Sequence, residues 1–263
     1  MMRAFEHGTP AVGEGPTGAA SPARRRLRAA GELLIGFTLL FAGVELAMGL
    51  LDAPPMLRVS AGGLYLALAV VLVGPGEAPP ARLGWANRVT LLRAALVLLI
   101  AGLLVFPEVP RAHPYAVLGL ALAALLLDGV DGWVARRTRS ITAFGARFDM
   151  ELDAFFILVL CVGLVATERV GPWVLGIGLA RYLFVCAGRL LPWMRRPLPP
   201  SVFRKVVCVW QVVTLLLCFV PAMPAAVAVG AAATALSLLA VSFGRDTWWL
   251  LRHRCDARTP DAS

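Results

Sequence analysis

The sequence contains few charged residues and almost no lysine. Charged side chains make up 16% of its 263 residues, whereas hydrophobic residues make up 59%. A soluble domain has only about 45–50% apolar residues. The composition therefore excludes an ordinary water-soluble enzyme, and the long apolar runs between short charged segments indicate a multi-span membrane protein.

Cysteine is also sparse. The five cysteines form no C-x-x-C pair and show no regular spacing, which argues against a zinc site or a disulfide framework. Four of them (Cys161, Cys186, Cys208 and Cys218) lie inside apolar runs. We expect these four to behave as small buried hydrophobic residues.

The basic charge comes almost entirely from arginine. The net charge is +9, and Lys205 is the only lysine. The arginines cluster at the ends of the apolar runs, which is typical of membrane topology and of contact with anionic lipid head groups. We therefore expect no nucleic-acid partner.

Eight apolar runs predict an all-α, polytopic membrane bundle. They lie at about 31–51, 60–75, 88–107, 114–131, 146–166, 171–191, 205–220 and 223–243. Several are shorter than the roughly 20 residues of a typical membrane span, so their boundaries are approximate. The Pro- and Gly-rich segment 75–86 breaks the helical pattern after the second run.

This break divides the chain into a two-helix extension and a six-helix body. We expect a disordered basic cytoplasmic tail at 1–29, two transmembrane helices within 30–75, the body at 84–243 and a cytoplasmic tail at 244–263. The first run is as long as a full span and has no convincing cleavage site, so we expect no removable signal peptide.

The distribution of arginine predicts the orientation. With the N-terminus in the cytoplasm, most basic residues face the cytoplasm, and only Arg58, Arg111 and Arg169 face the other side. This asymmetry follows the positive-inside rule. An even number of spans then places both termini in the cytoplasm, and we expect a plasma (inner) membrane location.

Four aspartates occur in the fourth and fifth apolar runs. The fourth ends in LLLDGVDGWVARRTRS and the fifth begins in FGARFDMELDAFF. A carboxylate at membrane depth costs at least about 2.5 kcal/mol, so each is a functional candidate. Asp128 and Asp131 share one helical stripe at i and i+3, as do Asp149 and Asp153 at i and i+4. Two antiparallel helices can thus bring all four carboxylates together.

Such a cluster favours divalent metal and phosphate chemistry. Four facing carboxylates require countercharge, and oxygen-only ligands favour Mg²⁺ or Mn²⁺ over zinc. Arg136 follows the first aspartate pair, and its planar guanidinium suits a phosphate oxygen. The pattern indicates phosphoryl-type transfer on a substrate at the membrane surface.

These positions resemble the signature of the CDP-alcohol phosphatidyltransferase family. The eight matching residues are Asp128, Asp131, Gly132, Ala135, Arg136, Gly145, Asp149 and Asp153. Upstream, Asn87-x2-Thr90-x2-Arg93 is similar to the start of the first helix in many family members. The resemblance covers about residues 84–243 and leaves the 30–75 extension outside it.

The resemblance implies a six-helix membrane domain, usually a homodimer, that binds two metal ions and a CDP-linked lipid such as CDP-diacylglycerol. It implies that Asp128, Asp131 and Asp149 are metal ligands. Asp153 would lie near the metals and act as the general base for the acceptor hydroxyl. That hydroxyl would attack the lipid-side phosphorus in line, and CMP would leave.

The resemblance also implies a CDP site. Gly132, Ala135 and Gly145 would leave room for the cytidine, and Arg136 would hold the diphosphate. The full set expected at the nucleotide is Asp131, Gly132, Ala135, Arg136, Gly145, Asn87 and Thr90.

The acceptor alcohol stays open. Arg181 lies within an apolar run, where it either pairs with a buried acid or faces the cavity and binds a phosphate-bearing acceptor. Arg189 and Lys205 lie near the next cytoplasmic junction and mark topology or contact the same ligand. We favour a phosphatidylglycerophosphate-synthase-like reaction with glycerol 3-phosphate. An uncharged or zwitterionic alcohol, a second lipid, and a CDP-choline or CDP-ethanolamine donor remain alternatives.

Two charged residues in apolar runs have no clear place in this scheme. Glu45 is expected to pair with an arginine or to lie at a dimer contact, and Arg93 to take a structural role or to contact substrate. Two other classes also fit intramembrane carboxylates: a metal transporter, and a non-catalytic relative that binds lipid without turnover.

Overall fold

The computed structural model describes residues 22–73, 85–138, 143–195, 199 and 201–253, and these residues form helices and no strands. The α-helices are α1 (Pro22–Leu51), α2 (Leu57–Val73), α3 (Trp85–Leu103), α4 (Glu108–Ala112), α5 (Pro114–Thr138), α6 (Ala143–Ala166), α7 (Leu175–Leu190), α8 (Val202–Cys218) and α9 (Ala225–Arg252). Two short 3-10 turns, η1 (Pro172–Val174) and η2 (Pro192–Arg195), flank α7.

Each of the eight apolar runs forms a long helix, as predicted. Among the described residues, four segments are long and apolar enough to cross a membrane: Gly31–Leu51, Pro114–Gly132, Pro172–Leu190 and Ala225–Arg252. Large hydrophobic side chains remain exposed on many helices, including Leu50 on α1, Leu126 on α5 and Leu183 on α7. Helices with apolar outer faces are suited to a lipid environment, as expected for a polytopic bundle.

The helix ends differ from the expected domain limits. Residues 22–29, assigned to a disordered tail, belong to α1, and α9 continues through residues 244–252 of the expected C-terminal tail. The last apolar run was expected to end at about residue 243, before the charged pair Arg245 and Asp246. No proline interrupts this stretch, and Trp248, Trp249 and Leu250 continue the apolar pattern, so the helix persists.

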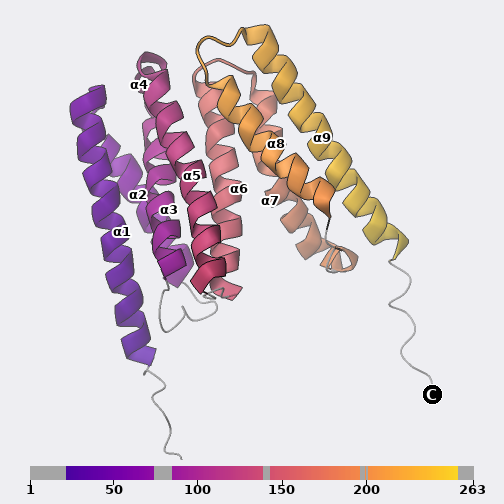
Figure 1. Cartoon of the computed structure of the whole chain (residues 1–263), viewed down its shortest axis with the longest axis horizontal. Coiled ribbons are helices and arrows are strands. Elements are labelled where there is room, and N and C mark those ends of the chain that lie inside the picture. The colour runs from indigo at the N-terminus through magenta and orange to yellow at the C-terminus, as the bar shows by residue number, and fades with distance from the viewer. Residues whose placement is uncertain (1–21, 74–84, 139–142, 196–198, 200, 254–263) are drawn as a thin grey trace, which may run out of the picture.

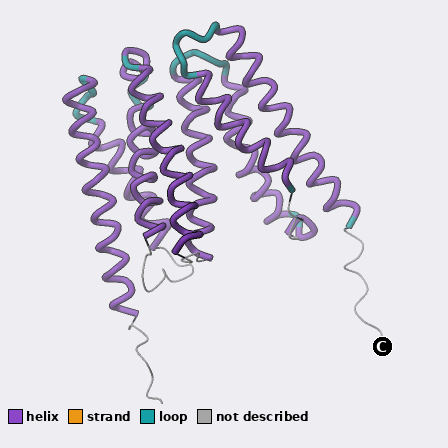
Figure 2. Tube along the Cα trace, viewed as in Figure 1, coloured by secondary structure: helices purple, strands orange, loops and turns teal. Residues whose placement is uncertain are grey.

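The bundle has two hydrophobic cores that meet at α3. The smaller core joins α1 and α2 to α3 through residues such as Val44, Leu57 and Leu98. The larger core joins α3 to α5, α6, α7, α8 and α9. Figures 1 and 2 show the helices side by side, with α1 at one edge and α9 at the other. The predicted two-helix extension therefore packs directly on the first helix of the body.

Ion pairs and carbonyl contacts lie at the end of the bundle opposite the first turns of α3 and α6. Glu45 and Arg58 form a two-pronged ion pair, with Nε–Oε1 and Nη2–Oε2 distances of 2.6 and 2.7 Å. Of the two roles expected for Glu45, the structure shows the arginine pair. Arg111 contacts Glu168 and the Ala166 carbonyl.

The cysteines divide into two groups. Cys161 and Cys218 are buried, as predicted, whereas Cys186 and Cys208 are exposed. The prediction of burial was wrong for the latter two because an apolar run around a residue does not reveal which face of the helix meets a neighbour. Cys255 lies outside the described residues.

Candidate active site

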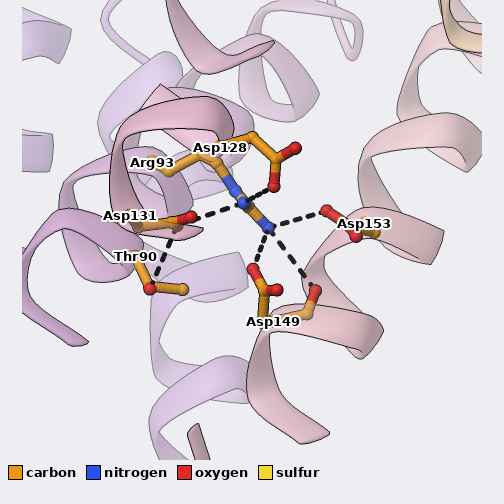
Figure 3. A network of polar contacts seen from close by, with 6 residues as sticks. All are labelled: Thr90, Arg93, Asp128, Asp131, Asp149 and Asp153. Atoms are coloured by element: carbon orange, nitrogen blue, oxygen red, sulfur yellow. Dashed lines mark hydrogen bonds and ion pairs between the residues drawn. The ribbon is translucent and has the colours of Figure 1, made fainter. Parts of the chain in front are cut away.

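The ends of three helices meet where the four aspartates lie. The first turns of α3, the last turns of α5 and the first turns of α6 are adjacent (Figure 1). Thr90 and Arg93 come from α3, one helical turn apart on the same face. Asp128 and Asp131 come from α5, while Asp149 and Asp153 come from α6. Figure 3 shows all six side chains directed toward one another.

The carboxylates form one compact cluster, as their spacing predicts. Asp128, Asp131 and Asp149 each offer an oxygen atom, and these atoms lie within 4.8 Å of one another. Asp131 is buried, whereas the other three side chains are 39–44% exposed. The cluster therefore has one deep carboxylate and three that are accessible from outside.

Arg93 lies at the centre of the cluster. Its Nη1 contacts Asp128 and lies 3.2 Å from Asp131 Oδ2. Its Nη2 lies 2.9 Å from Asp149 Oδ1 and 2.8 Å from Asp153 Oδ1. The side chain is only 2% exposed, so its guanidinium meets the four carboxylates inside the protein rather than in solvent (Figure 3). From the sequence, Arg93 was expected either to take a structural role or to contact substrate. Its position among the four aspartates was not predicted.

Thr90 supports the deep carboxylate. Its Oγ1 donates a hydrogen bond of 3.2 Å to Asp131 Oδ2, the same oxygen that Arg93 contacts. Thr90 was expected at the nucleotide, and in the structure its hydroxyl is buried against Asp131. Its visible role is to hold that carboxylate in place.

The donor set fits hard divalent cations. Three carboxylate oxygens from α5 and α6 lie close enough to share an ion, and Mg²⁺ and Mn²⁺ prefer such ligands. Asp149 Oδ1 is buried and, within the described part of the chain, makes the ion pair with Arg93 but no hydrogen bond. Four carboxylates also exceed the single positive charge of Arg93, and uncompensated buried charge is costly. The cluster can therefore accept the positive charge of a metal ion.

The remaining residues of the expected CDP site are described only in part. Gly132 on α5 and Gly145 on α6 are half-buried. The side chains of Asn87, Ala135 and Arg136 lie outside the described residues. Their assignment to the nucleotide stays a prediction.

A cavity of about 270 Å³ adjoins the aspartate cluster between α6, α7, α8 and α9. Asp153 lines it and also contacts Arg93, so this carboxylate belongs to both sites. Apolar side chains form much of the wall, and the polar lining residues are Asp153, Arg181, Arg204, Cys208, Gln211, Ser242 and Asp246. An apolar cavity with a few convergent polar groups is typical of a ligand site.

Arg181 has an acidic partner, which is exposed rather than buried as considered, and it also lines the cavity. Its Nη2 lies 2.6 Å from Glu151 Oε1, and Asp153 lines the same cavity. Its Nε is buried and has no hydrogen-bond partner within the described residues. One donor of this guanidinium is therefore available to a ligand.

The other predicted acceptor residues lie elsewhere. Arg189 and Lys205 are exposed and are not among the residues that line the cavity. Arg204, which precedes Lys205 in the sequence, lines the cavity instead and pairs with Asp246 at 3.3 Å. On α8 the side chain of residue 204 is turned about 100° from that of residue 205, because a helix turns once every 3.6 residues. Sequence position alone did not show which basic residue faces inward.

Gln211 is a cavity residue that sequence reasoning missed. Its side chain is 4% exposed, and its Nε2 has no hydrogen-bond partner within the described residues. The signal available in the sequence was a single amide inside the apolar run at 205–220. A buried amide without a partner is costly, so its position at the wall of a cavity suggests a ligand contact.

Comparison with known proteins assigns the chain to a family. The family model for CDP-alcohol phosphatidyltransferase matches residues 83–242, which include the aspartate cluster and all the residues that line the cavity except Phe243 and Asp246. A Dictyostelium discoideum protein named as an uncharacterized class-I member of that family is 39% identical over 66 residues. A cardiolipin synthase (CMP-forming) from Streptomyces coelicolor is 35% identical over 97 residues.

These matches are partial. The first covers 25% of this chain and 16% of the Dictyostelium protein, and the second covers 36% and 45% respectively. No solved structure matches the chain. With four helices among the described residues suited to crossing a membrane and a family match over most of its length, the chain is a polytopic helical membrane protein that belongs to the CDP-alcohol phosphatidyltransferase family.

Proposed function

We propose that this enzyme transfers the phosphatidyl group of CDP-diacylglycerol to the hydroxyl group of an alcohol that carries a phosphate, with release of CMP. The observation that carries the proposal is the position of Asp153. Its carboxylate contacts the centre of the aspartate cluster and lines the cavity that contains Arg181 and Arg204. Donor and acceptor sites would thus meet at one carboxylate.

On the donor side, Asp128, Asp131 and Asp149 would hold two divalent ions, Mg²⁺ or Mn²⁺, with Asp153 beside them. When bound, these ions supply charge neutralisation for the diphosphate and for the CMP leaving group. Gly132, Ala135, Arg136, Gly145 and Asn87 would surround the nucleotide, as the family resemblance implies. Thr90 and Arg93 keep the carboxylates oriented.

On the acceptor side, Asp153 would accept the proton of the attacking hydroxyl. A carboxylate within reach of the hydroxyl contributes typically 10²–10⁴-fold as a general base. The phosphate of the acceptor would lie between Arg181 and Arg204, whose guanidinium groups suit phosphate oxygens. Arg181 Nε and Gln211 Nε2, which have no hydrogen-bond partner within the described residues, are donors available for it. The transferred group then forms a new phosphorus–oxygen bond to the acceptor as the bond to CMP breaks.

We further propose that the active site opens to the cytoplasmic leaflet of the plasma (inner) membrane and that the enzyme is a homodimer. Arg137 lies near the end of α5, six residues after Asp131, and Arg136 and Arg139 are close to it in the sequence. Under the positive-inside rule this arginine-rich end favours the cytoplasm. The dimer rests on the family resemblance alone.

A lipid alcohol is the second candidate acceptor. It is favoured by the similarity to the Streptomyces protein, whose name describes a cardiolipin synthase that forms CMP. Much of the cavity wall is apolar, from residues such as Ile157, Ile177 and Leu239. A phosphate-bearing lipid head group shares the chemistry of a small sugar or polyol phosphate, so the two acceptors must be separated by experiment.

The test is turnover by the purified full chain with CDP-diacylglycerol and Mn²⁺ or Mg²⁺. Glycerol 3-phosphate, inositol phosphate, phosphatidylglycerol and uncharged or zwitterionic alcohols are offered in turn, with CMP and the lipid product measured. We expect CMP release only with a phosphate-bearing alcohol, and the product identifies which one. Turnover only with an alcohol lacking phosphate would contradict the acceptor assignment. The donor is tested in parallel by replacing CDP-diacylglycerol with CDP-choline or CDP-ethanolamine. Turnover only with one of these two would contradict the donor assignment.

A further inference from the structure

Arg93 is the buried cation of the aspartate cluster. Nη1 contacts the two carboxylates of α5, and Nη2 contacts the two carboxylates of α6. A single guanidinium therefore joins the two halves of the proposed metal site (Figure 3).

The contacts of Arg93 fall on the atoms that a metal ion needs. A divalent ion held by these carboxylates draws on the lone pairs of their oxygens. Arg93 contacts one oxygen of each of the four groups, and one of these, Asp149 Oδ1, has no hydrogen bond within the described part of the chain. Because the guanidinium is 2% exposed, it cannot give up these contacts simply by turning into solvent. It must shift within the protein.

We propose that Arg93 is a built-in counter-cation that competes with divalent metal for the four carboxylates. Without metal it holds α5 and α6 together and prevents four like charges from repelling one another. With metal, Arg93 gives up part of its contacts to the carboxylates, so metal affinity is weaker than the carboxylates alone would provide. This inference rests on the metal site of the proposed function and assigns to Arg93 a positioning role.

The proposal predicts opposite effects of one substitution on two quantities. In Arg93→Gln the metal-free protein should unfold at lower temperature, because the carboxylates lose their counter-cation. The same variant should bind Mn²⁺ more tightly, by about fivefold or more, because the competing charge is gone. A residue that only orients the ligands would lower the stability and the metal affinity together.

The experiment measures Mn²⁺ binding directly by electron paramagnetic resonance of the free ion, on the purified full chain without substrate. Thermal unfolding is recorded in EDTA and in excess Mn²⁺. Arg88→Gln is the matched control, since Arg88 lies on the same helix and pairs with Glu32 at 2.7 Å, away from the cluster. We expect Arg88→Gln to bind Mn²⁺ like the unchanged protein.

Arg93→Lys provides the second variant, for the case that Arg93→Gln does not fold in EDTA. A lysine keeps the charge but has one nitrogen in place of the two that serve the two aspartate pairs. We expect partial loss of stability in EDTA, recovery in Mn²⁺, and affinity at least as high as that of the unchanged protein. Unchanged Mn²⁺ affinity in Arg93→Gln, or weaker affinity in the variants that fold, overturns the inference.

Failure of the metal site itself gives a different result. Asp128→Asn and Asp149→Asn should each weaken Mn²⁺ binding. If neither does, the bound Mn²⁺ is not at the cluster, and the metal part of the proposed function is wrong along with the inference. If both aspartate variants weaken Mn²⁺ binding and the Arg93 variants weaken it too, the aspartates do bind the metal. Only the proposed competition between Arg93 and the metal is then excluded.

Discussion

At the scale of single residues, Asp153 and Gln211 have different proposed roles that kinetic measurements can distinguish. Asp153 lies at the junction of the cluster and the cavity. Gln211 lies within the cavity wall with an unpaired amide nitrogen among the described residues. The first is assigned to proton transfer and the second to recognition of the acceptor, so their variants should change different kinetic parameters.

Asp153→Asn should lower kcat by at least about 100-fold, because an amide cannot accept the proton of the acceptor hydroxyl. Binding of the CDP-lipid should be largely preserved. CMP release and direct CDP-lipid binding are the two measurements. Glu168→Gln, which alters an exposed carboxylate paired with Arg111, is the control and should keep full turnover. Normal turnover by Asp153→Asn would exclude Asp153 as the base.

Gln211→Leu should raise the acceptor KM by about tenfold and leave the KM for the CDP-lipid unchanged. The loss of one hydrogen bond to a charged group costs about 1.5–3 kcal/mol. Thr214→Val is a matched control on the same helix, since Thr214 is buried but does not line the cavity. An unaltered acceptor KM in Gln211→Leu would remove this residue from the acceptor site. The measurement is steady-state CMP release at varied acceptor concentration.

At the scale of helices, the sequence correctly predicted which aspartates share a face of the same helix, because this depends on that helix alone. Asp128 and Asp131 share a face because they are three residues apart, and Asp149 and Asp153 because they are four apart. Helix ends were less well predicted. The structure extends α9 to Arg252, since charged residues near the membrane surface can continue a helix that leaves the apolar region.

The contact between α6 and α7 depends on one small residue. A Cβ atom added at Gly178 would lie 2.7 Å from the Leu158 backbone, whereas one added at Gly188, also on α7, would meet nothing within 4 Å. Gly178→Ala should therefore destabilise the protein by about 1–3 kcal/mol.

Gly188→Ala is the control and should be neutral or slightly stabilising, because alanine is the better helix former. Thermal unfolding in detergent, with CMP release as the readout of intact protein, measures both variants. Equal unfolding temperatures for the two alanine variants would show that α6 and α7 do not pack closely at Gly178.

At the scale of the whole molecule, the three arginines expected on the non-cytoplasmic side all have partners within the protein. Arg58 and Arg111 pair with Glu45 and Glu168, and Arg169 donates to the carbonyl groups of Cys218, Val220 and Met223. These three arginines are therefore bound to groups of the protein. This is compatible with a non-cytoplasmic location despite the positive-inside rule.

The orientation can be tested with reporters fused to each terminus. Fluorescent protein fusions should be bright, and alkaline phosphatase fusions inactive, if both termini are cytoplasmic. The expected physical cause is the excess of arginine on that side. Active phosphatase at either terminus would contradict the proposed topology, and with it the cytoplasmic location of the active site.

The sequence by itself determined the helical class, the long helices of the described residues and the two aspartate stripes. Apolar run length and helical period depend only on neighbours in the chain, so they can be read without a fold. The spacing of the aspartates and their neighbouring residues also resembled the signature of the family before the structure was considered. The side chains of Ala135 and Arg136 belong to that same pattern, and their contacts stay predictions.

The tertiary structure alone decided which charges meet. Arg93 reaches carboxylates 35 to 60 residues away, and Arg204 rather than Lys205 faces the cavity. Gln211 becomes a candidate only because α8 packs against α6 and α9 around a hollow. Such contacts depend on the rotation and distance of helices relative to one another, which side-chain packing sets and no local pattern encodes.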